Sequence, residues 1–187
     1  MDLLSEYLYH EKQDGLLCAQ HCLNSLLQNQ TFSAVDLSEI AQRLDNEEKK
    51  ILYTSNFTSK NMDDTGYFSS QVIEEALKIF SMELINIDSD NPKAIKAKKD
   101  PSKQKAFICN YESHWFTLRK FGKNNNHSMW YNLDSKLNKP KQLSFTYLDA
   151  YLSQLRIEGY TIFIPSYIND PERQLEPCEA DAIIDIL

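Results

Sequence analysis

Glycine and proline are scarce in this sequence, with four glycines and six prolines among 187 residues. Hydrophobic residues make up 42% and charged residues 25%, a composition that excludes wholesale disorder and is typical of a folded globular protein. A chain of this length can bury a core without disulfide bonds or bound metal. We therefore expect one folded domain over residues 1–187, in which residues from about 170 form a C-terminal extension.

Long apolar runs and a positive charge balance are also lacking. No stretch approaches the roughly 20 apolar residues of a membrane span, and residues 1–12 lack the basic and apolar segments of a secretory signal. The formal charge of -7 argues against nucleic-acid binding, which depends on basic surface. We expect a protein of the nucleus and cytoplasm, where cysteines stay reduced, with neither nucleic acid nor a membrane as partner.

The N-terminal half has the apolar spacing of amphipathic helices. A first helix is expected just after Asp14, and a second from Ser33. Ser69 can cap a third helix, whose spacing places Phe80 on the buried face. Residues 45–68, between the second and third helices, lack a clean period and are predicted to be an irregular or mobile connection.

The C-terminal half changes to short runs rich in β-branched and aromatic residues, which are typical of strands. Strands are expected at residues 83–87, 106–110, 114–121, 129–133 and 160–164. A helix is expected within residues 144–159, and a hairpin loop at residues 122–128. Helices packed on a mainly antiparallel sheet give an α+β fold.

Two polar segments have no clear helix or strand pattern. The lysine-rich residues 93–105 are expected to form a solvated loop, with contact to an acidic partner as the alternative. The chain after residue 165 is acidic and rich in turn residues until a short amphipathic end. We expect this end to dock on the domain or to begin a helix through Ala182, Ile183 and Ile186.

Three residues near the start of the first helix, Cys18, His21 and Cys22, carry reactive side chains. No second ligand pair with zinc-site spacing follows, and a redox dithiol needs C-x-x-C, so neither a metal nor a redox site is predicted. Burial in the core is the ordinary fate of a free cysteine and suits Cys22, Cys109 and Cys178. Cys18 differs because N–H groups in the first turn of a helix stabilise a thiolate. We assign His21 a role in packing or in supporting the residues of the site.

A nucleophile at Cys18 would need a base, and His114 with Asp134 can supply one and its orienting group. If their strands form a hairpin that pairs Phe121 with Met129, Phe116 lies opposite Asp134, and His114 lies two residues away on the same face. Another even register puts His114 directly opposite Asp134, whereas an odd register separates the two side chains. Taken singly, His114 could be an exposed strand-end histidine and Asp134 a turn residue.

Together these residues have the types needed for a thiol hydrolase. His114 would deprotonate Cys18, or form an ion pair with it, and then protonate the leaving amine while Asp134 fixes the ring tautomer. Asn132 shares the face of Asp134 and is a weaker candidate for that role. The oxyanion also needs N–H donors, for which the backbone of Cys18 and the side chain of Gln13 are candidates. Gln13 could equally be a solvent-exposed residue.

Several segments resemble the Josephin domain, a family of papain-like cysteine proteases that remove ubiquitin. They are "HEKQDGLLCAQHCLNSLLQ" (10–28), "NMDDTGYFSSQVIEEALKIFSMELI" (61–85), "FICNYESHWFTLRK" (107–120), "WYNLDS" (130–135) and "CEAD" (178–181). The motifs follow the family's order and span nearly the whole chain. The resemblance implies a papain-like fold with the nucleophile at a helix start.

The resemblance also implies the reaction, which is cleavage of the isopeptide or peptide bond after the C-terminal glycine of ubiquitin. The family's nucleophile falls on Cys18, its base on His114 and its oxyanion glutamine on Gln13. The third member falls on Asp134, where part of the family has asparagine. Ubiquitin, polyubiquitin chains or ubiquitinated proteins are the implied partners, and no cofactor is expected.

Ubiquitin-contact positions of the family fall on Phe32, Ser70, Gln71 and Phe80. We expect a monomer. Two other functions are left open by the sequence. One is a ubiquitin-binding module with little turnover, and the other is a transglutaminase-like acyl transferase that uses the same three side chains.

Overall fold

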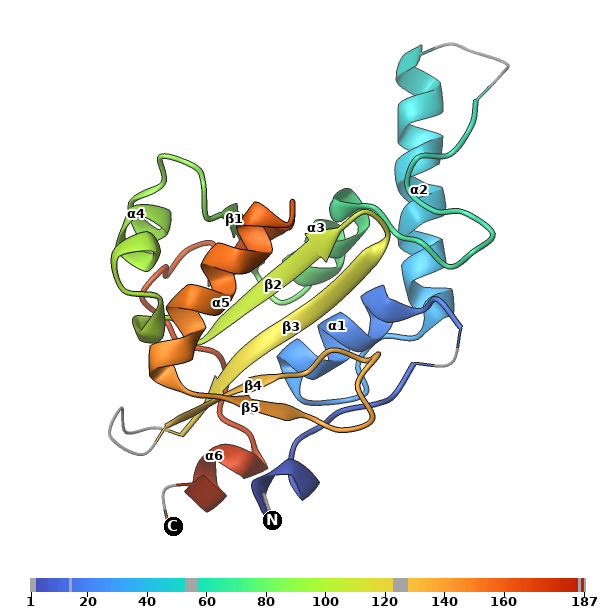
Figure 1. Cartoon of the computed structure of the whole chain (residues 1–187). Coiled ribbons are helices and arrows are strands. Elements are labelled where there is room, and N and C mark those ends of the chain that lie inside the picture. The colour runs from blue at the N-terminus through green and yellow to red at the C-terminus, as the bar shows by residue number, and fades with distance from the viewer. Residues whose placement is uncertain (1–2, 14, 53–56, 123–127, 185, 187) are drawn as a thin grey trace.

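The computed structural model of the chain describes residues 3–13, 15–52, 57–122, 128–184 and 186. Asp14 and most of the predicted hairpin loop at 122–128 lie outside this range. The described part has an α+β fold in which helices pack on both faces of one antiparallel sheet (Figure 1). The predicted fold class is therefore confirmed.

The sheet has six strands in the described part of the chain, in the order β1-β6-β2-β3-β4-β5. Their bounds are β1 Met82–Asn86, β2 Ala106–Tyr111, β3 His114–Phe121, β4 Met129–Asn132, β5 Lys141–Leu143 and β6 Thr161–Tyr167. The five predicted strands are present. The short edge strand β5 was not predicted, because two of its three residues are exposed and give it no apolar pattern.

The helical elements follow the sequence pattern in part. Their bounds are η1 Leu3–Glu6, α1 Cys18–Leu27, α2 Ala34–Leu52, α3 Ser70–Lys78, α4 Pro92–Lys99, η2 Pro101–Lys103, α5 Phe145–Ile157 and α6 Glu179–Ile184. The predicted cap of α3 is confirmed, since the hydroxyl of Ser69 accepts a hydrogen bond from the Val72 amide. Phe80 lies beyond the end of α3 and is 37% exposed, so the prediction that it is buried was wrong.

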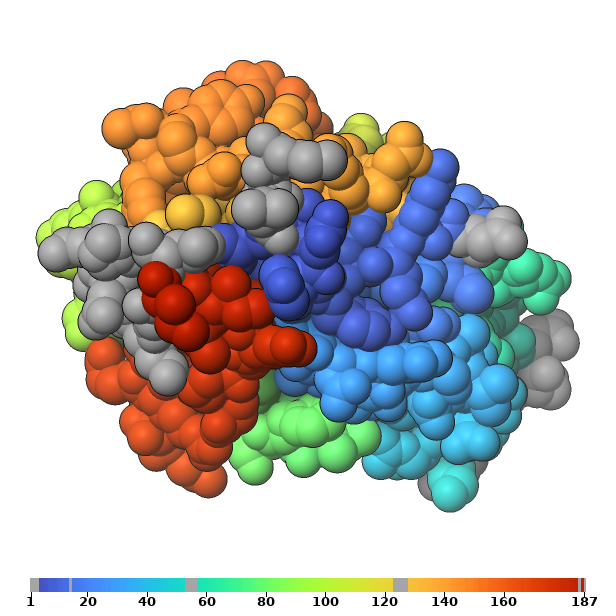
Figure 2. All heavy atoms as spheres, turned by 90° about the horizontal axis from the view of Figure 1, so that it is seen from below, coloured from blue at the N-terminus to red at the C-terminus, as the bar shows by residue number. Residues whose placement is uncertain are grey.

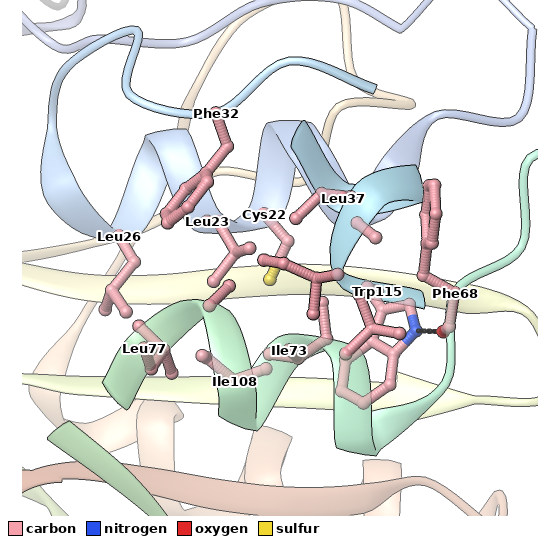
Figure 3. Close-up of a cluster of buried hydrophobic side chains, with 14 of the residues drawn as sticks. Cys22, Leu23, Leu26, Phe32, Leu37, Phe68, Ile73, Leu77, Ile108 and Trp115 are labelled. Atoms are coloured by element: carbon pink, nitrogen blue, oxygen red, sulfur yellow. Dashed lines mark hydrogen bonds between the residues drawn. The ribbon is translucent and has the colours of Figure 1, made fainter. Parts of the chain in front are cut away.

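The two faces of the sheet bury separate cores. Helices α1 and α3 cover one face, where Leu23 and Leu77 pack near Ile108 and Trp115 (Figure 3). Helices α4 and α5 cover the other face, around Trp130 and its neighbours. Residues 115 and 116 of β3 face opposite cores, as strand alternation requires. This strand therefore lies at the centre of the molecule.

Helix α2 is longer than predicted. It continues through residues 45–52, which were expected to be irregular, and it projects from the body of the protein (Figure 1). This part of α2 has little apolar periodicity because it is mostly exposed, but its glutamates, lysines and leucine favour helix. Asp45 is the exception: it is buried and accepts a 2.7 Å hydrogen bond from the side chain of Asn61.

The lysine-rich segment 93–105 was also mispredicted, because much of it forms α4 and η2 rather than a loop. The side chain of Asn91 caps α4 by accepting a 2.8 Å hydrogen bond from the Lys93 amide, and Pro92 occupies the first turn. Ala94 and Ala97 are fully buried against the sheet. Two alanines make too small an apolar face to stand out among the lysines.

The C-terminal helix α6 was expected, but its buried face was assigned wrongly. Ala180 and Ile184 point inward, whereas Ala182 and Ile186 are exposed. The burial of Asp181, which bonds backbone amides, sets this orientation. Helix α6 lies beside η1, so the two ends of the chain are neighbours (Figures 1 and 2). No helix in the described ranges has the length and apolarity to cross a bilayer.

Candidate active site

Cys18 is the first residue of α1, as predicted, and its side chain is only 3% exposed. Its Sγ donates a hydrogen bond to the carbonyl of Ser113 at 3.2 Å and accepts one from the amide of Trp115 at 3.4 Å. The thiol is therefore held against the backbone on both sides of His114. A backbone N–H donor and a helix start both stabilise negative charge on sulfur.

A tight turn between β2 and β3 brings His114 to this position. Tyr111 pairs with His114, so residues 112 and 113 alone form the connection. Glu112 has a φ of 51°, in the left-handed region that two-residue hairpin loops require. The turn places the Ser113 carbonyl and the His114 ring beside the start of α1.

The pairing of His114 with Asp134 follows the predicted register. Phe121 pairs with Met129, and the ladder continues through Leu118 and Asn132. The Nε2 atom of His114 lies 3.0 Å from both carboxylate oxygens of Asp134. The imidazole also stacks on Phe116, with 5.8 Å between ring centroids, so its plane is fixed by packing as well as by hydrogen bonds.

The surroundings of His114 favour its protonated form. Burial lowers the pKa of the imidazole, but hydrogen bonds and charge interactions with Asp134 and Cys18 outweigh burial and raise the pKa to about 9. With Nε2 directed at Asp134, Nδ1 is the ring atom left to interact with the thiol. An imidazolium beside a thiol favours the thiolate, which is the nucleophilic form.

Asp134 is itself held in place through both its carboxylate and its backbone. The amide of Lys136 donates to its Oδ1 at 2.9 Å, and the Asp134 amide donates to Oδ1 of Asn132 at 2.9 Å. The ring of His10 bonds to the Asp134 carbonyl at 3.0 Å. Asn132, the weaker orienting candidate, therefore shapes the turn, and its Nδ2 donates to the hydroxyl of Tyr151.

Gln13 lies in the segment that leads into Cys18, and Ser135 holds it there. The backbone amide of Gln13 donates to the Ser135 carbonyl at 2.8 Å, and the Ser135 hydroxyl donates to the side-chain Oε1 of Gln13 at 2.8 Å. The Gln13 Nε2 donates to the carbonyl of Gly15 at 2.8 Å. The side-chain amide of Gln13 is thus oriented by Ser135 at its oxygen and by Gly15 at its nitrogen.

The other cysteines and His21 have different surroundings. Burial raises the pKa of Cys22 to about 12, although the hydrogen bond with Thr117 lowers it, and burial also raises the pKa of Cys109. Cys178 packs against the edge of a core cluster as a partly buried residue, and its thiol donates to Asp181. His21 is buried, and its Nδ1 lies 3.0 Å from Glu11.

The four predicted ubiquitin-contact residues do not form one cluster. The rings of Phe32 and Phe80 meet edge to face at 6.0 Å and line a groove of about 550 Å³. Ser70 and Gln71 begin α3, whereas Phe80 follows its end. Phe80 is nine positions after Gln71, which corresponds to roughly 13 Å along a helix axis.

Several groups around Cys18 were not found from the sequence. The Ser113 carbonyl and the Trp115 amide carry no side-chain signal, because any residue can supply a backbone group. Ser135 directly follows Asp134, but its contact with Gln13 depends on how two distant segments pack. Among the described residues, no group of three or more histidine, cysteine or acidic side chains could hold a metal ion.

Comparison with known proteins places this arrangement in a family. The Josephin family model matches residues 13–166. The chain belongs to the Josephin family. Its helix-start cysteine, packed against an antiparallel sheet, is the papain-like arrangement of the Josephin fold.

Curated relatives of this Josephin protein agree with the assignment. The chain is 45% identical to ataxin-3 of Homo sapiens over 193 residues, which cover 97% of the chain and 50% of the relative. Identity to the ataxin-3-like protein of Homo sapiens is 42%, with 97% and 51% coverage. Identity to the ataxin-3 homolog of Caenorhabditis elegans is 44%, with 84% and 48% coverage. The chain spans about half the length of the curated relatives it matches.

Proposed function

We propose that this chain is a cysteine-type deubiquitinase that cleaves the isopeptide or peptide bond after the C-terminal glycine of ubiquitin. The observation that carries the proposal is the position of His114, whose ring interacts with the Cys18 thiol and with both oxygens of Asp134. Membership in the Josephin family supports the same reaction class. Ubiquitin, polyubiquitin chains and ubiquitinated proteins are the proposed partners.

In the proposed reaction, the Cys18 thiolate attacks the carbonyl carbon of the scissile bond. The protonated His114 ring then gives its proton to the leaving amine, and a thioester between Cys18 and ubiquitin remains. Water attacks the thioester while His114 accepts its proton, which releases the ubiquitin carboxyl group and restores the Cys18 thiolate beside the protonated ring. Asp134 fixes the ring tautomer and stabilises the imidazolium throughout.

The tetrahedral intermediates carry negative charge on oxygen, which requires N–H donors that are already in place. We assign this role to the backbone amide of Cys18 and the side-chain amide of Gln13. Ser135 supports Gln13 in this role by bonding to its Oε1, and Nε2, which bonds to the Gly15 carbonyl, has a second N–H group for the oxyanion. The phenylalanine pair Phe32 and Phe80 is proposed as an apolar contact for ubiquitin away from the reacting bond.

A ubiquitin derivative with a C-terminal electrophile tests the nucleophile directly. We expect the wild type to form a covalent adduct and the Cys18→Ala variant to form none. Cys22→Ala is a matched control, because Cys22 lies one turn further along α1 and bonds to Thr117 instead. An adduct with Cys18→Ala, or none with the folded wild type, would refute the proposal.

The probe also tests the first of the two other functions that the sequence leaves open, and a release assay tests the second. A ubiquitin-binding module with little turnover would bind ubiquitin without forming an adduct. An acyl transferase would form the adduct but would incorporate an added amine in place of releasing free ubiquitin. Measuring ubiquitin release with and without an added primary amine distinguishes transfer from hydrolysis.

A further inference from the structure

A second concave site lies at the other end of the sheet. It is a cavity of about 470 Å³ between α4, η2 and residues 171–175. Six basic side chains line it: Lys93, Lys96, Lys99, Lys103, Lys105 and Arg173. We refer to these residues and the cavity between them as the basic pocket.

The basic pocket has the opposite charge to the protein as a whole. Two carboxylates also line it, and they pair with two of the lysines: Asp100 with Lys103 at 3.4 Å and Glu172 with Lys96 at 3.3 Å. Arg173 pairs with Glu176, so the lining keeps an excess of basic side chains, six against two carboxylates, although three of the six are ion-paired. The whole chain has a formal charge of -7. Gathering like charges in one cavity is unfavourable, and a concave wall of low dielectric strengthens their field. Such a field attracts an anion.

Lys93 shows that the pocket is more than a group of solvated lysines. Its Nζ donates to the Ser166 hydroxyl at 3.0 Å and to the Pro171 carbonyl at 2.7 Å, both of which are uncharged acceptors. Burial lowers the pKa of Lys93, while more distant carboxylates, Glu172 first among them, act to raise it. The two hydrogen bonds fix the position of the ammonium group, and one of its three N–H groups is left to bind an anion.

The basic pocket is separate from the proposed active site. Lys105 precedes β2, whose first residue pairs with Arg119, whereas the last residue of β2 pairs with His114. The length of β2 therefore lies between them, which is about 17 Å at 3.4 Å per residue. Helix α4, which lines the pocket, also lies far from α1 in Figure 1.

We propose that the basic pocket binds a compact, multiply phosphorylated anion. Five of its six cations are lysines, which bind phosphate as point charges, and a compact anion with several charges can contact several of them at once. The cavity volume lies within the range of small-molecule sites, about 300–1,000 Å³. The net negative charge of the whole chain disfavours a long polyanion such as nucleic acid.

Calorimetric titration with inorganic tripolyphosphate, at an ionic strength of about 0.15 M, tests the proposal. We expect saturable binding to the wild type with one site, and weaker binding of orthophosphate. The double variant Lys96→Glu with Lys99→Glu should weaken tripolyphosphate binding by about tenfold or more. The control variant Lys50→Glu with Lys98→Glu has the same charge change at exposed residues that do not line the pocket, and should bind as the wild type does.

Amide chemical shifts of the wild type provide a measurement that needs no variant. Tripolyphosphate should move the signals of residues 93–105 and 165–175 and leave those of Cys18 and His114 in place. Equal weakening in both double variants, no binding at all, or shifts spread over the surface would overturn the proposal.

Two further binding measurements show whether the phosphorylated ligand is a lipid headgroup or a free anion. Phosphatidylcholine vesicles with and without a phosphoinositide test a lipid headgroup. Binding to those vesicles that is lost in the Lys96→Glu, Lys99→Glu variant would assign the pocket to a headgroup, whereas binding of tripolyphosphate alone would assign it to a free phosphate. Preference for an oligoglutamate peptide over tripolyphosphate would refute the phosphate assignment in favour of an acidic protein partner.

Discussion

The two ends of strand β3 hold charged side chains in opposite ways. At its start, His114 carries a proton that can leave, and its ring is 12% exposed beside Cys18 and Asp134. Near its end, Arg119 carries a permanent charge, is 3% exposed, and donates to the carbonyls of Leu26 and Glu176. The same strand thus supplies a reversible charge at one end and a fixed one at the other.

At the Arg119 end of β3, Asp181 of α6 supplies a carboxylate close to the guanidinium. Its carboxylate lies 3.9 Å from the Arg119 guanidinium and accepts from the amides of Gly122 and Cys178 at 2.7 and 2.8 Å. Buried charges at this end are matched by several hydrogen bonds, which anchors the C-terminal segment. The comparison teaches that changes at the start of β3 should alter chemistry, and changes near its end should alter stability.

The largest expected effect is on turnover, at the His114 end. His114→Ala should lower kcat for ubiquitin release by about 10⁴-fold. The variant lacks the ring that protonates the leaving amine in the first step and accepts the proton of water in the second. Ubiquitin affinity should change little, whereas the free energy of unfolding should fall because the stabilisation from the protonated ring beside Asp134 is lost. His21→Ala is the matched histidine control and should keep kcat. Parallel losses of affinity and kcat in His114→Ala would mean that the residue acts in folding or binding.

Asp181→Ala should have the largest effect on stability. It leaves Arg119 without its carboxylate neighbour and two backbone amides without their acceptor, which we expect to cost about 3–5 kcal/mol in the free energy of unfolding. Urea unfolding measures this, and Asp181→Asn should lose less because one acceptor oxygen remains. Turnover per folded molecule should stay at the wild-type level. A loss of turnover without a loss of stability would break the division between the two ends of β3.

The His114 end should also make stability depend on pH. The folded pKa of His114, about 9, lies above its ordinary value of 6.5, so the folded state holds the extra proton between these values. This stabilisation, at most about 3 kcal/mol, is complete below pH 6.5 and is lost as pH rises to about 9.

Urea unfolding of the wild type and Asp134→Asn across this pH range checks the sign. The difference in unfolding free energy between the two proteins should shrink as pH rises. Lys120, whose pKa burial lowers to about 8, titrates in both proteins and cancels in the comparison. A difference that stays constant with pH would show that Asp134 does not hold the proton on His114.

The smallest effect concerns Ser135. Ser135→Ala removes the hydrogen bond to Oε1 of Gln13, so kcat should fall by about tenfold while KM changes little. Ser135→Thr keeps a hydroxyl group and should recover part of the loss. Combining Ser135→Ala with Gln13→Ala should cost no more than Gln13→Ala alone, and a fully additive loss would contradict a role through Gln13.

The sequence could predict the parts of this site that follow from periodicity. Cys18 was expected in the first turn of a helix from the apolar stripe behind it, and strand alternation limited His114 and Asp134 to one face in any even register. Both positions are found as expected. Their roles in catalysis stay predictions until turnover is measured.

The rest of the fold depends on contacts that leave no local pattern. The outer part of α2 is exposed and follows helix propensity alone, and α4 is held by two small alanines. The buried face of α6 is set by Asp181, a charged residue that pattern reading assigns to solvent. Gln13 and Ser135 meet only because segments far apart in the sequence pack together. Such partners become visible only in three dimensions.

The place of β6 in the sheet has a consequence for synthesis of the chain. Strand β6 lies between β1 and β2, although it is the last strand to be made. On the ribosome, β1 and β2 must therefore wait on the order of several seconds for the strand that separates them. During that time Cys18, His114 and Asp134 have all been made, but the sheet is open in its middle. Direct pairing of β1 with β2 would trap the nascent chain, so the newly made protein depends on keeping those two strands apart.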